Sequence, residues 1–472
     1  MKQRIVALLL TLVLALSLLP ASAFAADMTE DGLRYQLTMD AGECCAVITG
    51  YTGTAAELTI PSEIDGCAVK SIGESAFQSC KTLKSVKLPD SLTELGKFAF
   101  FDCTSLTSVT IPAGVTHIPL GAFDGCNKLT EVTLPDGLTG LDSYAFSGCK
   151  KLKQITIPEG VKFIGHNTFY DCSALAEITV PASVTLIGND AFLDCSRLKT
   201  VTLQEGLTTI GYRAFMHCTA LESVKIPVSV TSIDNFAFMD CTGLSEIVFC
   251  GDVPDWGYDV FRFVKATVYY PGDNSTWNES SLVDHGGTLS WIPYAPLPFT
   301  DLTPSSFCYD PIVWAVEQGI TSGTTATTFS PAASCSRAQA VTFLWRAAGC
   351  PEPTSTSHPF TDINEKAYYY KAMLWAVENG ITAGMTADTF APDSFCSRGQ
   401  VVTFLWRAAG KPEPSSTSHP FQDVNTKAYY YKAMLWAVEN GITAGMTATT
   451  FAPDQACTRG QVVTFLYRNY VS

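Results

Sequence analysis

Residues 80–100 read CKTLKSVKLPDSLTELGKFAF, and close variants of this stretch recur every 23 residues. Each variant keeps a cysteine, alternating apolar residues, usually a hydrophobic-Pro pair, and a closing phenylalanine that alanine usually precedes. A fixed period of this length predicts a solenoid, in which each repeat forms one turn stacked on the next. The alternation predicts two short extended segments per turn. The cysteines that keep the period are Cys80, Cys103, Cys126, Cys149, Cys172, Cys195, Cys218 and Cys241.

The regular repeats occupy residues 71–249, and the period fails on both sides of them. Solenoid ends expose apolar core unless another segment covers them. We therefore expect an N-terminal cap at 27–70 and a C-terminal cap and linker at 250–296, where Trp256, Trp277 and Trp291 supply apolar side chains.

This array resembles the BspA-like leucine-rich repeat, closely so from Leu58 to about Phe249. The resemblance implies a domain of bacterial or parasite surface proteins, some of which bind host or partner macromolecules. Because the fold is mainly a display scaffold, it predicts a protein or host-surface ligand without identifying one.

Aromatic and methionine side chains gather around the Ala-Phe turns, outside the core positions of the repeat. They could form a contact face for a partner, or they could pack sideways on one another. The candidate residues are Phe98, Phe101, Tyr144, Phe163, Tyr170, Leu193, Tyr212, Met216, Phe236 and Met239.

A second repeat, of 61 residues, occupies the C-terminal part of the chain. Arg337, Arg398 and Arg459 each hold the second position of a Ser/Thr-Arg-Ala/Gly-Gln tetrapeptide. Ser336 followed by Gln339 is a capping-box pattern, which predicts a helix that starts at the arginine. Unpaired backbone N–H groups and the positive helix end favour an anion there. The alternative is that each arginine only pairs with a nearby carboxylate such as Asp301.

Each 61-residue copy also contains an upstream amphipathic segment that ends before a glycine, so we expect a helix, a Gly/Thr loop and a second helix. The copies resemble the S-layer homology module, with modules at 297–350, 358–411 and 419–472. The matching motifs in the first copy are Phe-Thr-Asp-Leu (299–302), Ala-Val-Glu-x-Gly-Ile (315–320), Thr-Phe-Ser-Pro (328–331) and Ser-Arg-Ala-Gln (336–339).

The resemblance implies that three modules pack as an all-α pseudo-trimer. The family holds exported proteins non-covalently on the cell wall by binding an anionic secondary wall polysaccharide, often bearing pyruvate ketals. Carried over by position, this role falls on three arginines, three aspartates and three loop glycines. They are Arg337, Arg398, Arg459, Asp301, Asp362, Asp423, Gly323, Gly384 and Gly445.

The chain departs from the family pattern at two points. A Gln replaces the commoner Glu of the tetrapeptide, which removes one negative charge per module. Phe307, Tyr368 and Tyr429 stand where the family often has Trp before the first helix. Both changes leave the identity of the glycan open.

Residues 1–25 read as an export signal, with Lys2 and Arg4 before an apolar run and Ala23-Phe24-Ala25 at its end. No other apolar run is long enough to cross a membrane, so we expect a secreted, wall-attached protein without membrane insertion. The net charge of −15 argues against a nucleic-acid partner.

Seventeen cysteines in an exported chain would suggest disulfides. Parallel strands in register hold the ladder cysteines side by side, so we expect these to remain free thiols. The sequence does not pair Cys44, Cys45, Cys67, Cys250, Cys308 or Cys350.

The six histidines fall in no catalytic motif, and His285-Gly286-Gly287 is more consistent with a turn in the C-terminal cap than with an oxyanion loop. We therefore expect no enzyme, metal or cofactor. The sequence predicts a wall-anchored surface protein that displays a solenoid for adhesion or protein recognition. A self-associating surface-layer component is the first alternative, and an exported enzyme with its site at 250–296 is the second.

Overall fold

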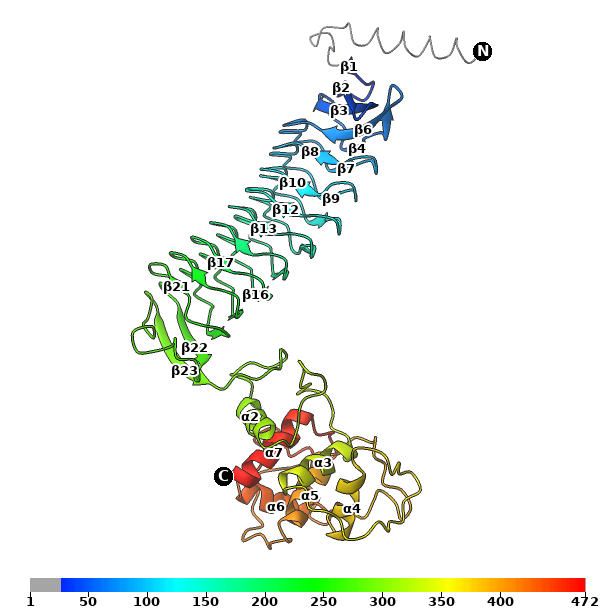
Figure 1. Ribbon diagram of the computed structural model, residues 1–472, viewed down its shortest axis with the longest axis vertical. Helices are drawn as coiled ribbons and strands as arrows, with labels where there is room; N and C mark the ends of the chain where they lie inside the picture. Colours follow the sequence, from blue (N-terminus) through cyan, green and yellow to red (C-terminus); the bar gives the residue numbers. More distant parts are fainter. Residues whose placement is uncertain (1–26, 472) are drawn as a thin grey trace. The chain divides into compact units, whose positions relative to one another are not determined.

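The computed structural model describes residues 27–471, so the predicted export signal lies outside the described residues. The chain divides into two compact units, with the boundary between Tyr294 and Ala295. Stacked turns with short strands build the first unit, and helices build the second (Figure 1). This confirms the predicted fold class of a β-solenoid followed by an all-α region. None of the helices described has both the length and the apolar character needed to cross a bilayer.

Most solenoid turns contribute two short strands, which pair in parallel at an offset of 23 residues, as Ile187 does with Ile210. The first sheet contains β10 (His117–Ile118), β12 (Gly140–Leu141), β13 (Phe163–Ile164), β15 (Leu186–Ile187), β17 (Thr209–Ile210), β19 (Ser232–Ile233) and β21 (Asp255–Trp256). The second set of strands forms two sheets. One sheet contains β4 (Glu57–Thr59), β7 (Ser85–Lys87), β9 (Ser108–Thr110) and β11 (Glu131–Thr133). The other contains β14 (Glu177–Val180), β16 (Thr200–Leu203), β18 (Ser223–Ile226), β20 (Glu246–Phe249), β22 (Lys265–Pro271) and β23 (Thr288–Tyr294).

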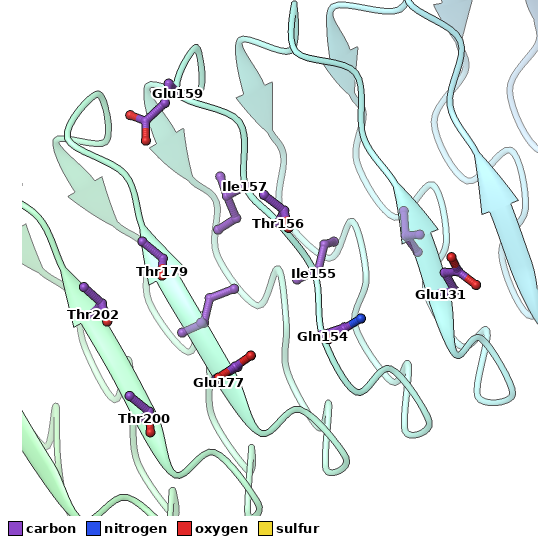
Figure 2. A pocket seen from close by; sticks show the side chains of 12 residues that line it. Glu131, Gln154, Ile155, Thr156, Ile157, Glu159, Glu177, Thr179, Thr200 and Thr202 are labelled. Atoms are coloured by element: carbon purple, nitrogen blue, oxygen red, sulfur yellow. The ribbon is translucent and has the colours of Figure 1, made fainter.

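This second set of strands is interrupted at residues 154–157, which lie between β11 and β14 without forming a strand. A cavity of about 570 Å³ opens at the interruption, and its lining includes Glu131, Glu159, Glu177 and several threonines (Figure 2). Residues 154–157 keep the apolar alternation of the neighbouring turns. Nothing in their sequence explains why the ladder breaks there.

Two ladders of identical side chains fill the solenoid core. The phenylalanines from Phe77 to Phe261 stack on one another, with ring centroids 4.9–5.8 Å apart. The cysteines are free thiols, and from Cys103 to Cys241 each Sγ donates to the carbonyl of a phenylalanine 26 residues earlier, at 3.0–3.4 Å. The thiols thus satisfy backbone groups inside the core, which explains why a small, weakly polar residue recurs there.

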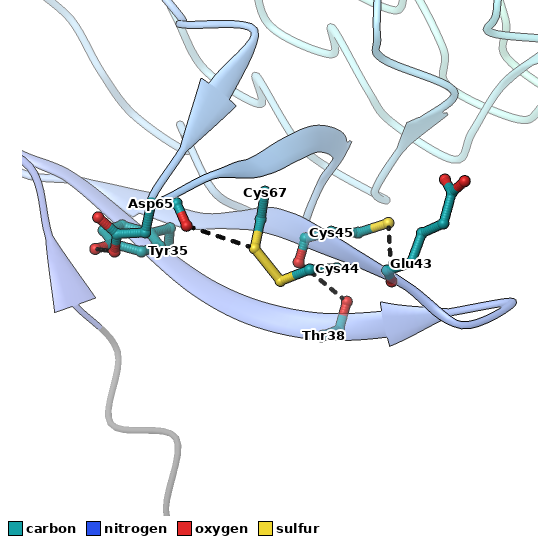
Figure 3. Close-up of a disulfide and its surroundings, with 7 residues drawn as sticks. All are labelled: Tyr35, Thr38, Glu43, Cys44, Cys45, Asp65 and Cys67. Carbon is teal, nitrogen blue, oxygen red and sulfur yellow. Dashed lines mark hydrogen bonds between the residues drawn. A yellow bond between two sulfur atoms is a disulfide. The ribbon is translucent and has the colours of Figure 1, made fainter. Parts of the chain in front are cut away.

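An antiparallel segment of three strands begins the solenoid and pairs with its first turn. Its strands are β1 (Asp27–Met28), β2 (Leu33–Asp40) and β3 (Glu43–Tyr51), joined in one sheet by β5 (Glu63–Ile64), β6 (Cys67–Ile72) and β8 (Glu94–Leu95). A disulfide joins Cys44 of β3 to Cys67 of β6, with 5.0 Å between their Cα atoms (Figure 3). The expectation of free thiols concerned the ladder cysteines, and the sequence left Cys44 and Cys67 without an assigned partner. They are 23 residues apart, and the pairing of Cys45 with Ala68 places them opposite each other on β3 and β6.

Aromatic side chains close the other end of the solenoid. Trp256, Trp277 and Trp291 surround Phe249, with ring centroids 5.0–6.4 Å from it. His285 packs on Trp256 at 4.1 Å and lies in a turn with Gly286 and Gly287, as expected from the sequence.

The second unit contains two helices from each of three modules. They are α2 (Tyr309–Glu317), α3 (Arg337–Ala347), α4 (Tyr370–Glu378), α5 (Arg398–Ala408), α6 (Tyr431–Glu439) and α7 (Arg459–Val471). Helices α3, α5 and α7 contact one another, while α4 packs on α3, α6 on α5 and α2 on α7. The first helix of the unit therefore packs against the last, which closes the three modules into a ring.

A ring of backbone hydrogen bonds joins the three modules. The N–H of Cys335 donates to Cys457, that of Cys457 to Cys396, and that of Cys396 to Cys335, at 2.8–2.9 Å. All three side chains are fully buried. The cysteines that repeat every 61 residues therefore mark the pseudo-threefold axis.

Candidate binding grooves between the C-terminal modules

The tetrapeptide starts each inner helix in the way the sequence predicts. In the first module the Ser336 hydroxyl accepts from the backbone N–H of Gln339, and Gln339 Oε1 accepts from the N–H of Ser336. The same reciprocal bonds occur in the other two modules. The capping box places Arg337, Arg398 and Arg459 at the first residue of α3, α5 and α7.

The three arginines are buried rather than presented on an open surface. Arg337, Arg398 and Arg459 are only 1–4% exposed. Arg337 Nε donates to the Phe390 carbonyl at 2.9 Å, and its guanidinium lies over the rings of Phe390 and Phe404. Arg398 and Arg459 have the same type of carbonyl bond and ring contacts.

A groove of about 330 Å³ lies against Arg459, and another of the same size lies against Arg337. We number each groove by the module that supplies its Gly loop. The lining of groove 1 includes Thr321, Ser322, Gly323, Thr324, Gln339, Arg346, Tyr368 and Arg459. The lining of groove 2 includes Thr382, Ala383, Gly384, Met385, Gln400, Arg407, Tyr429 and Arg337.

Each groove combines residues from all three modules. In groove 1 the loop comes from the first module, Arg459 from the third and Tyr368 from the second. Groove 2 follows the same rule one module further on. At the third loop Arg398 donates to Thr443, and we call this equivalent position groove 3. The arginine and the glycine that meet in a groove therefore come from different copies of the repeat.

The aspartates do not line these two grooves. Asp301 accepts from the backbone N–H groups of Phe329 and Ser330 at 2.9 and 2.7 Å, and Asp362 and Asp423 make the equivalent bonds. The carbonyl of the same Phe329 accepts from Arg459. The aspartates thus position the segment that holds each arginine.

The buried arginines carry charge without an ionic partner. Burial lowers the pKa of Arg337, Arg398 and Arg459 below the usual arginine value. Among residues 27–471, no carboxylate lies within ion-pair distance of them, so the alternative pairing with Asp301 is wrong. A desolvated cation that faces a groove without a counter-charge favours an anionic ligand.

A second arginine lines each of the two grooves and was missed by the sequence reasoning. Arg346 and Arg407 lie in the last turns of α3 and α5, and each donates to an isoleucine carbonyl at 3.0 Å. Arg468 makes the equivalent bond in α7. Their 61-residue spacing was visible, but a basic residue in a last helical turn has an ordinary explanation in the helix dipole.

The ten candidate residues on the solenoid do not form one exposed face. Tyr144 is 41% exposed, whereas Leu193 is 9% exposed. Phe98 packs edge-on against Phe101, and Tyr212 does so against Phe236. Phe163 lies in strand β13 beside His117, away from the row of turns. Part of the set therefore packs sideways on itself.

Family comparisons agree with both repeat arrays. A model of the BspA type leucine rich repeat region matches residues 52–176 and 162–281. A model of the S-layer homology domain matches residues 298–341, 359–402 and 420–463. The chain is therefore a BspA-type leucine-rich repeat protein with three S-layer homology domains. These domains make it a cell-surface, cell-wall-associated protein, and neither family is catalytic.

Known relatives share only part of their length with this chain. An endoglucanase of Bacillus sp. is 34% identical over 178 residues, which is 35% of this chain and 18% of that protein. A surface-layer 125 kDa protein of Lysinibacillus sphaericus is 31% identical over 24% of this chain and 10% of its own length. Among solved structures, a leucine-rich repeat protein from Bacteroides ovatus is 26% identical, covers 56% of this chain and 76% of its own, and gives a TM-score of 0.43.

Proposed function

We propose that the three grooves bind an anionic wall polysaccharide and hold the exported chain on the cell wall without a covalent bond. The observation that carries this proposal is the buried guanidinium at the grooves, which has no carboxylate partner. A second arginine supports it in grooves 1 and 2, and no Asp or Glu lines either groove. Carboxylate groups such as pyruvate ketals would supply the missing negative charge.

Three grooves on one rigid unit would bind a repeating polymer more tightly than one groove. Each site can be weak, because a polymer bound at one groove holds its next repeat close to another. The closed ring of modules fixes the spacing between grooves before the ligand arrives. This supports a stable anchor built from modest contacts.

The test is binding of the chain to purified cell walls before and after their polysaccharide is extracted. Because Arg337, Arg398 and Arg459 are buried, their removal would disturb the fold, so the variant is R346Q/R407Q/R468Q. The matched control is K366Q/K411Q/K427Q, which removes the same charge at exposed positions that line neither groove 1 nor groove 2.

We expect the wild type to bind intact walls and to lose binding on extracted walls. The groove variant should bind at least about tenfold more weakly, since each lost charged contact weakens a multivalent site. The control should bind within about twofold of the wild type, as expected for exposed charges. Equal binding to extracted walls, or equal losses in both variants, would contradict the proposal.

We further propose that the anchored solenoid displays a recognition surface for adhesion or protein binding. Its support is the 11% aromatic content of the chain together with partly exposed aromatic side chains such as Tyr144 and Tyr212 at the turns. The alternative is lateral assembly into a surface layer. Sedimentation of the purified chain separates the two: a monomer at micromolar concentration favours recognition, and concentration-dependent growth favours assembly.

A further inference from the structure

The three buried arginines differ at one atom. Arg337 Nη2 donates to Thr382 Oγ1, and Arg398 Nη2 donates to Thr443 Oγ1, both at 3.3 Å. Arg459 Nη2 is buried and has no hydrogen-bond partner in the described part of the chain. A buried N–H of a charged group is costly to leave unpaired, so this donor favours an acceptor supplied from groove 1.

The loops of the three grooves also differ in chemistry. Groove 1 has the hydroxyl residues Ser322 and Thr324 in its lining, and the Thr324 hydroxyl also bonds within the loop to Thr328 and Ser330. Groove 2 has Ala383 and Met385 at the same positions, and the third loop has Ala444 and Met446. Met385 and Met446 are 50% and 40% exposed, so they give these two loops an apolar surface.

The capping glutamines follow the same division. Gln400 Nε2 donates to the Met385 sulfur at 3.3 Å, and Gln461 Nε2 donates to the Met446 sulfur at 3.5 Å. Gln339 faces Thr324 in groove 1 in place of a methionine, so its amide N–H groups remain available to a ligand.

The aromatic residue before the first helix of each module differs between the third groove and the first two. Tyr368 lines groove 1 and Tyr429 lines groove 2. The equivalent residue of the first module is Phe307, which lies against Gly460 at the start of α7 and is 66% exposed. Groove 3 therefore receives a ring without a hydroxyl.

We infer that the three grooves are specialised: groove 1 adds hydrogen-bond donors that recognise the shape of a carboxylate, whereas grooves 2 and 3 combine the charge of their arginines with an apolar loop that contacts less polar parts of the polysaccharide. This inference rests on the proposed function. The free Nη2 donor of Arg459, the hydroxyls of Ser322 and Thr324 and the amide of Gln339 all meet in groove 1. In grooves 2 and 3 the arginine Nη2 already donates to a threonine hydroxyl, and the glutamine amide already donates to a methionine sulfur.

The experiment exchanges the two loop chemistries in the full exported chain. S322A/T324M gives groove 1 the loop of groove 2, and A383S/M385T does the reverse. T417M/S418A makes the same chemical change in the exposed linker and is the control. The probes are a wall polysaccharide bearing pyruvate ketals and the same polymer after its carboxylates are reduced to alcohols, with affinities measured by titration calorimetry.

We expect S322A/T324M to weaken binding of the native polymer about tenfold and to leave binding of the reduced polymer within about twofold. A383S/M385T should change the native affinity by less than about threefold, because Arg337 Nη2 stays with Thr382. Equal losses in the two exchanges, or a loss of the same size on both polymers, would overturn the inference alone. A wild-type chain that binds neither polymer would instead show that the proposed function is wrong.

Discussion

The solenoid and the C-terminal unit are both arrays of repeats, but the first is open and the second is closed. Each solenoid turn pairs with the turn before and the turn after it, as Phe169 stacks on Phe146 and Phe192. Each C-terminal module contacts both others, through the backbone ring of Cys335, Cys396 and Cys457. An open array can change length without losing its contacts, whereas a closed array needs every member.

Closure also determines where binding can occur. A solenoid turn presents its own side chains to solvent, so a surface can be extended one turn at a time. A C-terminal groove needs a loop, an arginine and an aromatic residue from three modules, as Gly323, Arg459 and Tyr368 show. Each groove therefore exists only when all three modules are folded together.

The largest expected effect comes from removing one repeat from each array. Deletion of 149–171 removes one solenoid turn and keeps the register, so we expect a folded chain with slightly lower stability. Deletion of 412–472 removes the third module and, with it, α7 and two bonds of the cysteine ring. We expect the remaining C-terminal helices to lose cooperative unfolding.

Circular dichroism and differential scanning calorimetry would compare the two deletion variants. The contrast between open and closed arrays would fail if the chain without residues 412–472 kept a sharp helical transition. It would fail equally if deletion of one solenoid turn abolished the solenoid transition.

A core substitution should cost about 3–5 kcal/mol of unfolding free energy in the solenoid and act locally. Phe169 is fully buried in the phenylalanine ladder, so F169A leaves a cavity between two neighbouring rings. T156A, at an exposed position of the same turn, is the control and should cost under about 0.5 kcal/mol. Hydrogen exchange should rise in the turns next to Phe169 first. A uniform rise over the whole chain would argue against local action.

Thiol reactivity should separate exposed from buried cysteines in both arrays. Cys350 is the exposed free cysteine among residues 27–471, whereas Cys172 and Cys396 are fully buried. Burial raises the pKa of Cys396 to about 12 and raises that of Cys172 as well. We expect iodoacetamide to label Cys350 at least about a hundredfold faster than either, as read by peptide mass spectrometry. Fast labelling of Cys172 in the native chain would contradict the core ladder.

The sequence was sufficient for features that depend on neighbours along the chain. The 23-residue period gave the solenoid and its core, because each turn contacts the turn exactly one period away. The capping box gave the start of α3, because Ser336 and Gln339 are three residues apart. In both cases the distance in sequence determines the contact.

The sequence was insufficient where distant copies meet. Three repeats of similar sequence do not reveal which arginine reaches which loop, so the pairing of Arg459 with Gly323 became visible only in the closed ring. The same closure buries the arginines against Phe329 and its equivalents. The aspartates hold the backbone segments that the arginines contact, as Asp301 does for Phe329. The Cys44–Cys67 disulfide joins cysteines 23 residues apart, which is also the spacing of the free ladder thiols, so spacing alone did not identify the bonded pair.

The smallest expected effect is a difference in acid sensitivity between the two units. Burial lowers the pKa of His285 from the ordinary 6.5. Burial acts to raise the pKa of Asp423, but the N–H donors of Phe451 and Ala452 outweigh it and lower that pKa from 3.8. Both residues therefore bind protons more weakly in the folded state than in the unfolded state.

The signs of these shifts place the two losses of stability in different pH ranges. The contribution of His285 to the cap is complete above about pH 6.5 and declines as the pH falls toward its lower folded pKa. The contribution of Asp423 is complete above about pH 4 and declines only below it. Melting temperatures measured from pH 7.5 to 3 should thus fall first in the solenoid transition, and H285Q should remove that early fall while D423N leaves it. If H285Q changed nothing between pH 6.5 and 5, the early acid response of the open array would have to come from another group.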